Sequence, residues 1–284
     1  MCIRDRSTDL VNWSDMRMVT VSASIGAGCT WAPEATYDPL TGEYVVYWAS
    51  KVEEDGYAKQ RLYYAKTRDF YTFTEPQVFI DMDESSIDTT IIRSSEDGKY
   101  YRYTKNEGGA TNDYGAKTKT VYVEVADTLL GEWTHIPSDS LNANQWVEGP
   151  TIFQFNQDDQ DNGAYCLLVD QFGGIGYYPL VTDDLTTGEF AQPDTAFKMP
   201  SRARHGTPIR ITSEEYARLM QQYGGQTVDN SSLQAAVDAQ VEANLQAADY
   251  TQDSWERYDA ALTNAQAILD KGTSATAAEV SAAQ

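Results

Sequence analysis

The sequence predicts a mainly β fold, a β-propeller with an incomplete first blade, followed by a small α-helical bundle segment. Four similar segments, each a polar turn, an apolar residue and a closing aromatic, recur along the chain. Their apolar positions, Leu10, Phe70, Leu129 and Leu185, are separated by about 60, 59 and 56 residues. Short β-rich runs repeated at such a period are typical of propeller blades. After residue 232 the composition changes to Ala, Gln, Asp and Glu, which indicates helices.

Pairs of strand-like runs precede the last three copies of this repeat. They cover residues 44–49 and 61–65, 99–103 and 120–125, and 164–169 and 175–180. β-Branched and aromatic residues dominate them, as expected of strands. A linear β-solenoid is the alternative, but its repeats are much shorter. We therefore predict a propeller.

Each repeat unit also opens with a distinctive strand-like segment, at residues 29–35, 86–92, 146–153 and 204–211. The first strands of propeller blades line a central channel. We therefore expect Glu34, Asp88, Glu148 and His205 to converge although they lie far apart in the sequence. In detail, residues 28–200 are predicted to form three consecutive four-stranded blades, with these four residues on the innermost strands.

The segment around Glu148 is the strongest single indication of chemistry. Glu148 lies between the apolar pair Trp146 and Val147 and a Gly149-Pro150 turn. Glycine takes backbone angles closed to other residues, and proline stiffens its own φ, so the carboxylate is held rigidly. Shielding by the apolar pair, together with the negative charge of Asp88, predicts a raised pKa for Glu148, which suits a general acid. The alternative is a turn carboxylate that caps nearby amides.

The net charge of −22 argues against nucleic acid and anionic membrane surfaces as partners. It fits a neutral oligo- or polysaccharide and an extracellular setting. No apolar stretch reaches 18 residues, so no membrane span is expected. The three cysteines are widely spaced and predict neither a disulfide framework nor a zinc site.

The domain organisation follows from the change in composition. We assign residues 1–220 to the propeller domain, 221–232 to a Gly- and polar-rich linker, and 233–284 to a helical module. Residues 213–220 are predicted to form a capped helical turn. In the module, Leu233, Val237, Val241 and Leu245 recur every four residues, as expected of an amphipathic helix. A second helix follows, and a third begins at Ala275.

Four motifs carry a family resemblance. They are Trp-Ala-Pro-Glu at 31–34, Ile-Asp at 87–88, Glu-Gly-Pro at 148–150 and Arg-His-Gly at 204–206. In order and spacing, over about residues 7–220, the chain resembles glycoside hydrolase family 43. The resemblance implies a five-bladed β-propeller that hydrolyses arabinofuranosides, xylosides or related furanosides with inversion. By motif, Glu148 resembles the general acid, Asp88 the aspartate that tunes its pKa and orients substrate, and His205 the channel histidine.

The family's aspartate base, which lies on the first blade, matches no residue here. The early aspartates, Asp5, Asp9 and Asp15, lie at or near the outer end of a remnant blade. We therefore expect a chain that starts inside a repeat and does not turn over substrate by itself. The resemblance implies no required cofactor. Some members hold a cation near the histidine, so calcium near His205 is an expectation, with His205 just outside the ligands rather than among them.

The helical tail resembles a FIVAR module, whose third helix is incomplete here. Such modules are common in secreted and cell-wall glycosidases of bacteria. This implies a secreted or cell-surface location and association with the cell wall. Adhesion or spacing at the cell surface is an alternative role for the tail that would coexist with catalysis.

Five further residues are candidates for substrate binding: Trp31, Glu34, Arg93, Lys105 and Gln171. Trp31 would form a substrate wall, with a packing aromatic as its alternative, and Glu34 has a structural salt bridge as its alternative. The others, like Asp170, follow blade strands and are candidates for contacts to sugar hydroxyls, although a structural role is the interpretation that we favour for each. Two other functions stay open: a non-catalytic propeller that binds carbohydrate or protein, and another inverting propeller family that acts on fructans or galactofuranosides.

Overall fold

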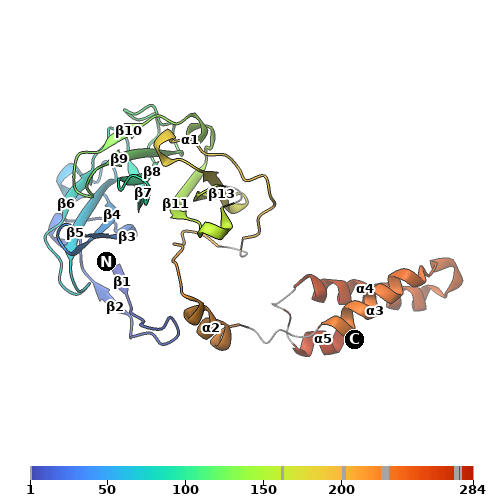
Figure 1. Ribbon diagram of the computed structural model, residues 1–284. Helices are drawn as coiled ribbons and strands as arrows, with labels where there is room; N and C mark the ends of the chain where they lie inside the picture. The colour runs from blue at the N-terminus through green and yellow to red at the C-terminus, as the bar shows by residue number, and fades with distance from the viewer. Residues whose placement is uncertain are drawn as a thin grey trace. The chain divides into compact units, whose positions relative to one another are not determined.

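The computed structural model describes residues 2–160, 163–199, 203–224, 230–271, 275 and 277–283 (Figure 1). The chain divides into two compact units. The first is formed by Met1–Asp5 and Asp15–Arg210, and the second by Arg6–Ser14 and Ile211–Gln284. The first unit is mainly β, as predicted, and the second contains four helices among its described residues. None of the described helices has both the length and the apolar character needed to cross a bilayer.

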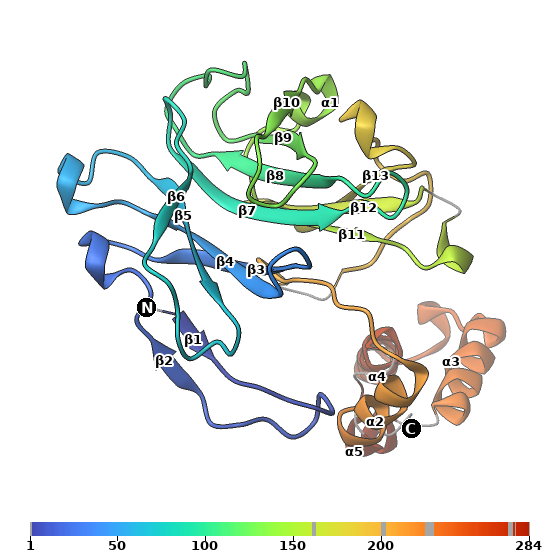
Figure 2. The ribbon, with the colours of Figure 1, turned by 60° about the vertical axis from the view of Figure 1, so that its left-hand side comes forward.

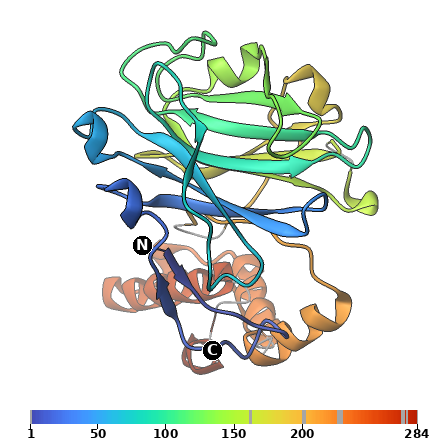
Figure 3. The ribbon, with the colours of Figure 1, turned by 90° about the vertical axis from the view of Figure 1, so that its left-hand side faces the viewer.

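Antiparallel sheets make up the described part of the first unit, and Figures 2 and 3 show them following one another in chain order, from blue to green. A two-stranded sheet pairs β1 (Cys2–Arg4) with β2 (Arg17–Val19). The next sheet contains β3 (Trp31–Asp38), β4 (Glu43–Ser50), β5 (Arg61–Thr67) and β6 (Gln77–Ile80). The following one contains β7 (Ser86–Arg93), β8 (Tyr100–Asn106), β9 (Val121–Ala126) and β10 (Thr134–Ile136). After the short helix α1 (Asp139–Ala143), the last contains β11 (Val147–Gln154), β12 (Tyr165–Gln171) and β13 (Gly176–Thr182).

Two of the three predicted four-stranded blades are confirmed, and the third is corrected. The β11–β13 sheet has three strands, and a single bridge between Val181 and Ala191 stands where a fourth strand was expected. Pro193, which lacks an N–H, follows closely and cannot extend the ladder. Five blades remain a prediction.

The strand predicted at residues 204–211 is wrong, because this segment pairs with no strand of the described structure. Pro208 lacks a backbone donor. Arg210 instead fixes the segment with its guanidinium, which donates to the carbonyls of Gln154 and Phe155 at 3.3 and 3.4 Å.

Two of the four repeated turns have the same hydrogen bonds, which supports the repeat inferred from the sequence for those two. In these turns the carboxylate of Asp9 or Asp69 accepts from the backbone N–H groups two and three residues further on. The next residue has a positive φ in both turns, 64° at Leu10 and 58° at Phe70. These hydrogen bonds lower the pKa of both aspartates.

Apolar side chains fill the gaps between neighbouring sheets. One cluster joins the β3–β6 sheet to the β7–β10 sheet through Val45, Tyr47, Tyr100 and Leu129. A larger one joins the β7–β10 sheet to the β11–β13 sheet, and it includes Tyr103, Val123, Leu167 and Leu180. This packing fixes the spacing of the inner strands that carry the site.

The described helices of the second unit are α2 (Ser213–Gln222), α3 (Ser231–Ala243), α4 (Gln252–Asp270) and α5 (Ala277–Ala283). Thr212 and Glu215 form a capping box at the start of α2, which confirms the capped turn. In the last three helices a small core includes Leu233, Val237 and Ile268. Val241 is 64% exposed, so the predicted apolar stripe is buried only in its first two turns.

Candidate active site

Three inner strands bring the site together. Figure 1 shows β3, β7 and β11 on the inner side of their sheets, and β7 contacts both of the others. Each strand has a bulge near its start, with one residue in the left-handed region: Ala32 (φ 45°), Asp88 (φ 50°) and Gly149 (φ 51°). His205 (φ 47°) repeats this conformation in the segment that follows the last sheet. Such bulges aim side chains away from the regular pleat, and backbone strain of this kind clusters at functional sites.

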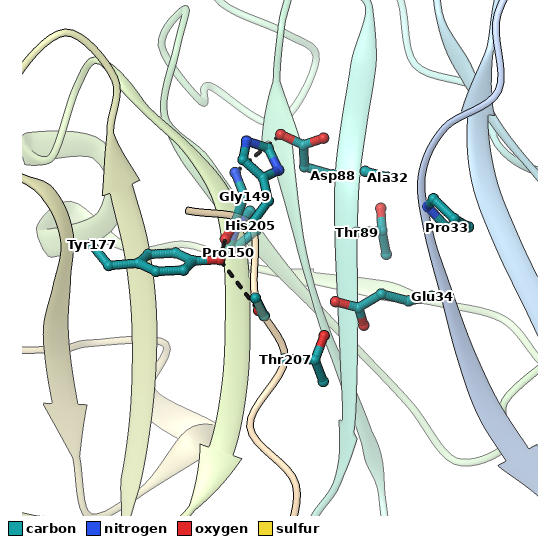
Figure 4. A pocket seen from close by; sticks show the side chains of 11 residues that line it. Ala32, Pro33, Glu34, Asp88, Thr89, Gly149, Pro150, Tyr177, His205 and Thr207 are labelled. Atoms are coloured by element: carbon teal, nitrogen blue, oxygen red, sulfur yellow. Dashed lines mark hydrogen bonds between the residues drawn. The ribbon is translucent and has the colours of Figure 1, made fainter. Parts of the chain in front are cut away.

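A cavity of about 140 Å³ lies between these bulges (Figure 4). It is lined by Ala32, Pro33, Glu34, Asp88, Thr89, Gly149, Pro150, Tyr177, His205, Gly206 and Thr207. The convergence of Glu34, Asp88 and His205 that the repeat predicted is therefore confirmed. Of these three residues, His205 alone lies outside a strand, in the same segment as the lining residues Gly206 and Thr207.

Glu148 adjoins the cavity and is surrounded by cations. Its Oε2 accepts from Lys105 Nζ at 3.1 Å, and its Oε1 accepts from Arg204 Nη2 at 2.9 Å. His205 Nε2 lies 3.3 Å from the same Oε1. Because each carboxylate oxygen has a positively charged partner, the ionised form of Glu148 is stabilised.

The raised pKa predicted for Glu148 is wrong for this structure. Partial burial raises the pKa, but the hydrogen bonds and charges of Lys105 and His205 outweigh it, so the pKa of Glu148 lies below its ordinary value. The shielding was also misjudged, since Trp146 is 55% exposed. No pattern in the sequence indicates that a lysine 43 positions away meets this carboxylate.

Asp88 is buried beside Glu148. Its Oδ2 accepts from the Gly149 N–H at 3.0 Å, and burial raises its pKa despite that bond and despite His205 and Lys105. Asp88, Glu148 and His205 each have one ligand-type atom within 4.8 Å of the others. The prediction that Asp88 and Glu148 share one site is therefore confirmed.

Glu34 contributes a second carboxyl, half-buried, on the other side of the cavity (Figure 4). Tyr47, which is buried, donates to Glu34 Oε2 at 3.3 Å. Burial raises the pKa of Glu34 to about 7, against a lowering by hydrogen bonds from Thr90 and Tyr47. Glu34 is thus protonated over part of the neutral pH range, and no salt bridge to it is found among the described residues.

Two residues at the site, Arg204 and Tyr177, were not predicted as site residues, and Asp170 was considered only as a contact to sugar hydroxyls. Arg204 Nε donates to the fully buried Asp170 at 2.6 Å, so Asp170 holds the guanidinium that meets Glu148. The Tyr177 hydroxyl lies 2.9 Å from the Gly149 carbonyl and 3.3 Å from the Gly206 carbonyl, and it joins the two turns. The place of Arg204 in the Arg-His-Gly motif was the available signal, whereas Tyr177 and Asp170 carried none beyond their strands.

The other four candidates for substrate binding lie at different places relative to the cavity and to Glu148. Lys105 is 2% exposed and pairs with Glu107 (2.7 Å) as well as Glu148. Gln171 is half-buried, and its Oε1 accepts from the Ile175 N–H in the β12–β13 turn. Trp31 is 49% exposed just before Ala32, at the cavity edge. Arg93 does not line the cavity, because it lies at the far end of β7 and donates to Gly98 in the next turn.

The donors at the site fit calcium poorly. Asp88, Glu148 and His205 are close enough to share an ion, but calcium prefers six to eight oxygen ligands and not an imidazole nitrogen. Lys105 and Arg204 already neutralise Glu148 and would repel a divalent cation. The residues present therefore do not fit a calcium ion.

Comparisons with known proteins place the first unit. Residues 2–217 match the family described as "Probable glycosyl hydrolase domain", related to glycoside hydrolase family 43. Over 200 residues the chain is 34% identical to an α-L-arabinofuranosidase of Bifidobacterium longum subsp. longum, covering 58% of this chain and 18% of that protein. The chain therefore spans less than a fifth of the length of this curated relative.

Solved structures are similar at lower sequence identity. An endo-1,4-β-xylanase from Bacteroides thetaiotaomicron is 19% identical, with a TM-score of 0.50, and the match covers 73% of this chain and 71% of that one. It shows a shared fold and nothing about activity. An exo-β-1,3-galactanase from Phanerochaete chrysosporium is 17% identical with a TM-score of 0.47, over 68% of this chain and 42% of that one.

Proposed function

This chain belongs to the glycosyl hydrolase family that matches residues 2–217, and from that premise we propose that it serves the inverting hydrolysis of furanosidic or xylosidic side chains of plant-type or cell-wall polysaccharides. The related α-L-arabinofuranosidase makes arabinofuranosides the first substrate to test. The observation that carries the proposal is the cluster of Asp88, Glu148 and His205 on neighbouring inner turns. A protein that only binds sugar needs no such pair of facing carboxylates.

In this proposal Glu148 is the general acid and Asp88 tunes it. Inverting hydrolysis separates acid and base by roughly 6.5–9.5 Å, which leaves room for the attacking water. Asp88 and Glu148 approach within 4.8 Å, too close to enclose that water. Asp88 therefore acts on Glu148 through its charge, and through the Gly149 N–H that it holds beside the acid.

An acid must carry a proton when the glycosidic oxygen leaves, yet Glu148 is held ionised by cations. Arg204 is the cation that can move, because its side chain is 46% exposed, whereas that of Lys105 is 2% exposed. We infer that a sugar entering beside Glu148 displaces Arg204 toward Asp170 and excludes water. Both changes raise the pKa of Glu148 and favour its protonated form.

The base stays unassigned. Among the described residues, the carboxylates that line the cavity are Glu34 and Asp88. Without a general base, the reaction loses the roughly 10²–10⁴-fold contribution of general-base catalysis to its rate. We therefore propose that this chain hydrolyses substrate slowly, while the acid step remains intact.

We propose that α3, α4 and α5 form a FIVAR-like module that keeps the protein near the cell wall. A polysaccharide substrate outside the cell requires a secreted or surface-attached protein. The net charge of −22 is compatible with such a setting.

The test compares two substrates that differ in how much their leaving group needs a proton. We expect Glu148→Ala to reduce the cleavage of an arabino-oligosaccharide by roughly 10²–10⁴-fold, because its leaving group needs a proton. The same variant should lose far less on 4-nitrophenyl α-L-arabinofuranoside, whose phenolate leaves without one. Sodium azide, a nucleophile that needs no base, should accelerate the wild-type chain and give the glycosyl azide of inverted configuration.

Equal losses on the two substrates would show that Glu148 is not a general acid. Hydrolysis as fast without azide as with it would place the base within this chain. If no pentoside is cleaved with or without azide, the proposed function is wrong.

A further inference from the structure

Trp146 presents a large apolar surface beside the proposed acid. Its side chain is 55% exposed, although it lies two residues before Glu148 and next to the fully buried Val147. Its backbone is in the left-handed region, with φ 65°. For a bulky residue this conformation is unfavourable and persists only where the surroundings impose it.

The neighbours of Trp146 hold its backbone in this left-handed conformation. On one side, the Gln145 side chain donates to the Thr118 carbonyl at 3.2 Å. On the other, the Val147 N–H donates to the Lys119 carbonyl at 3.2 Å. The turn is therefore pinned at both ends to the loop before β9, and its result is an indole that points outward instead of into the core.

A continuous set of contacts links this indole to Glu148. The Trp146 and Phe172 rings meet edge to face, with centroids 6.2 Å apart. Lys105 Nζ lies 4.9 Å from the centroid of Phe172 and 3.1 Å from Glu148 Oε2. Phe172 is half-buried in the β12–β13 turn, so its contact with Trp146 supports the indole.

Position then suggests what the indole binds. Glu148 must donate its proton to the oxygen that leaves, so the leaving group passes next to Glu148. Contacts through Phe172 link Trp146 to Lys105, which binds Oε2 of that carboxylate. His205 contacts the other oxygen, Oε1, and both His205 and Asp88 line the cavity. An exposed aromatic face suits the apolar face of a sugar ring.

We propose that Trp146, supported by Phe172, is a stacking platform for the sugar ring that leaves. The inference rests on the proposed function and deepens it: the substrate is a pentoside joined to another sugar, an oligo- or polysaccharide, and not a glycoside of a small aglycone. Trp146 thereby sets specificity without touching the bond that breaks.

The experiment compares two ligands by isothermal titration calorimetry with the whole chain. Trp146→Ala should weaken binding of α-1,5-linked arabinotriose roughly 2- to 12-fold, the range of single aromatic contacts, and leave methyl α-L-arabinofuranoside unchanged. Phe172→Ala should show a smaller loss of the same kind, and Trp146→Phe should retain most of the affinity. Trp13→Ala is the control, since Trp13 is a tryptophan of similar exposure (53%) in the loop of residues 6–14.

If Trp146→Ala binds the trisaccharide as tightly as the wild type, the platform is wrong and the proposed function stands. If it weakens both ligands equally, Trp146 shapes the whole site and the assignment to the leaving group is wrong. If the wild type binds neither ligand, the proposed function fails, and the pentoside platform fails with it. Unchanged thermal unfolding of the variants establishes that they are folded.

Discussion

Asp88 Oδ2 accepts a hydrogen bond from the Gly149 N–H at 3.0 Å. The buried carboxylate of one inner strand is thereby fastened to the backbone next to Glu148 on the neighbouring strand. Because Asp88 is held beside Glu148 and their charges interact, removing either the charge or the hydrogen bond should have separable effects.

Asp88→Asn removes the charge and keeps an oxygen for the Gly149 N–H. We expect the pKa of Glu148 to fall further, since a neighbouring negative charge favours the protonated form. Titration of the Glu148 carboxyl by ¹³C NMR measures this directly. An unchanged or higher pKa would mean that Asp88 does not tune Glu148.

Lys105→Met should move the pKa of Glu148 in the opposite direction. It removes a buried ammonium 3.1 Å from Oε2, one of the groups that hold this pKa below its ordinary value. The matched control is Lys119→Met, because Lys119 pairs with Glu107 and not with Glu148. In the same NMR titration, a rise for Lys105→Met with none for Lys119→Met is expected, and equal rises would contradict a specific contact.

Gly149→Ala should damage the site as well as the fold. A Cβ there meets the His205 ring at 2.9 Å, and the residue has φ 51°. Gly56→Ala is a matched control, with φ 66° and nothing within 4 Å of the added Cβ. Urea unfolding should show a loss of about 1–2 kcal/mol for the control, the usual cost of a left-handed residue, and a larger loss for Gly149→Ala.

Ligand affinity distinguishes the two glycines further. Gly149→Ala should weaken methyl α-L-arabinofuranoside binding because His205 is pushed aside, whereas Gly56→Ala should not. Equal unfolding losses and equal affinities would show that the approach of His205 to Gly149 is not a constraint.

The raised pKa of Glu34 predicts that the stability of the folded chain depends on pH. Its pKa is about 7 in the folded chain, against an ordinary value of 4.5. The folded state thus binds the proton of the Glu34 carboxyl more tightly than the unfolded state does. The contribution of this proton to the free energy of unfolding is therefore fully present below pH 4.5 and is lost as the pH rises through 7. Glu34→Gln mimics the protonated form and should therefore gain stability relative to wild type between pH 5 and 8 in urea unfolding. A constant difference across that range would contradict a raised pKa.

Local patterns were enough to predict much of the fold. The spacing of Leu10 and Phe70 marked equivalent turns, because an aspartate caps each one through its own neighbours. The strands around them were visible because alternate residues pack against adjacent sheets. Two predictions were wrong: a fourth strand in the β11–β13 sheet and a strand at residues 204–211. A strand needs a partner strand to pair with, and the sequence of one segment does not show whether that partner is present.

The sequence by itself determined that Asp88 and Glu148 lie close together, since they stand at the start of equivalent strands that lie side by side in neighbouring sheets. Only the tertiary structure decided the charge state of Glu148. Lys105 and Arg204 reach it from 43 and 56 positions away, and a pKa depends on distance in space and not on neighbours in the chain. The same holds for Trp146, whose sequence position beside Val147 suggested shielding, while the pinned left-handed turn directs its indole toward solvent.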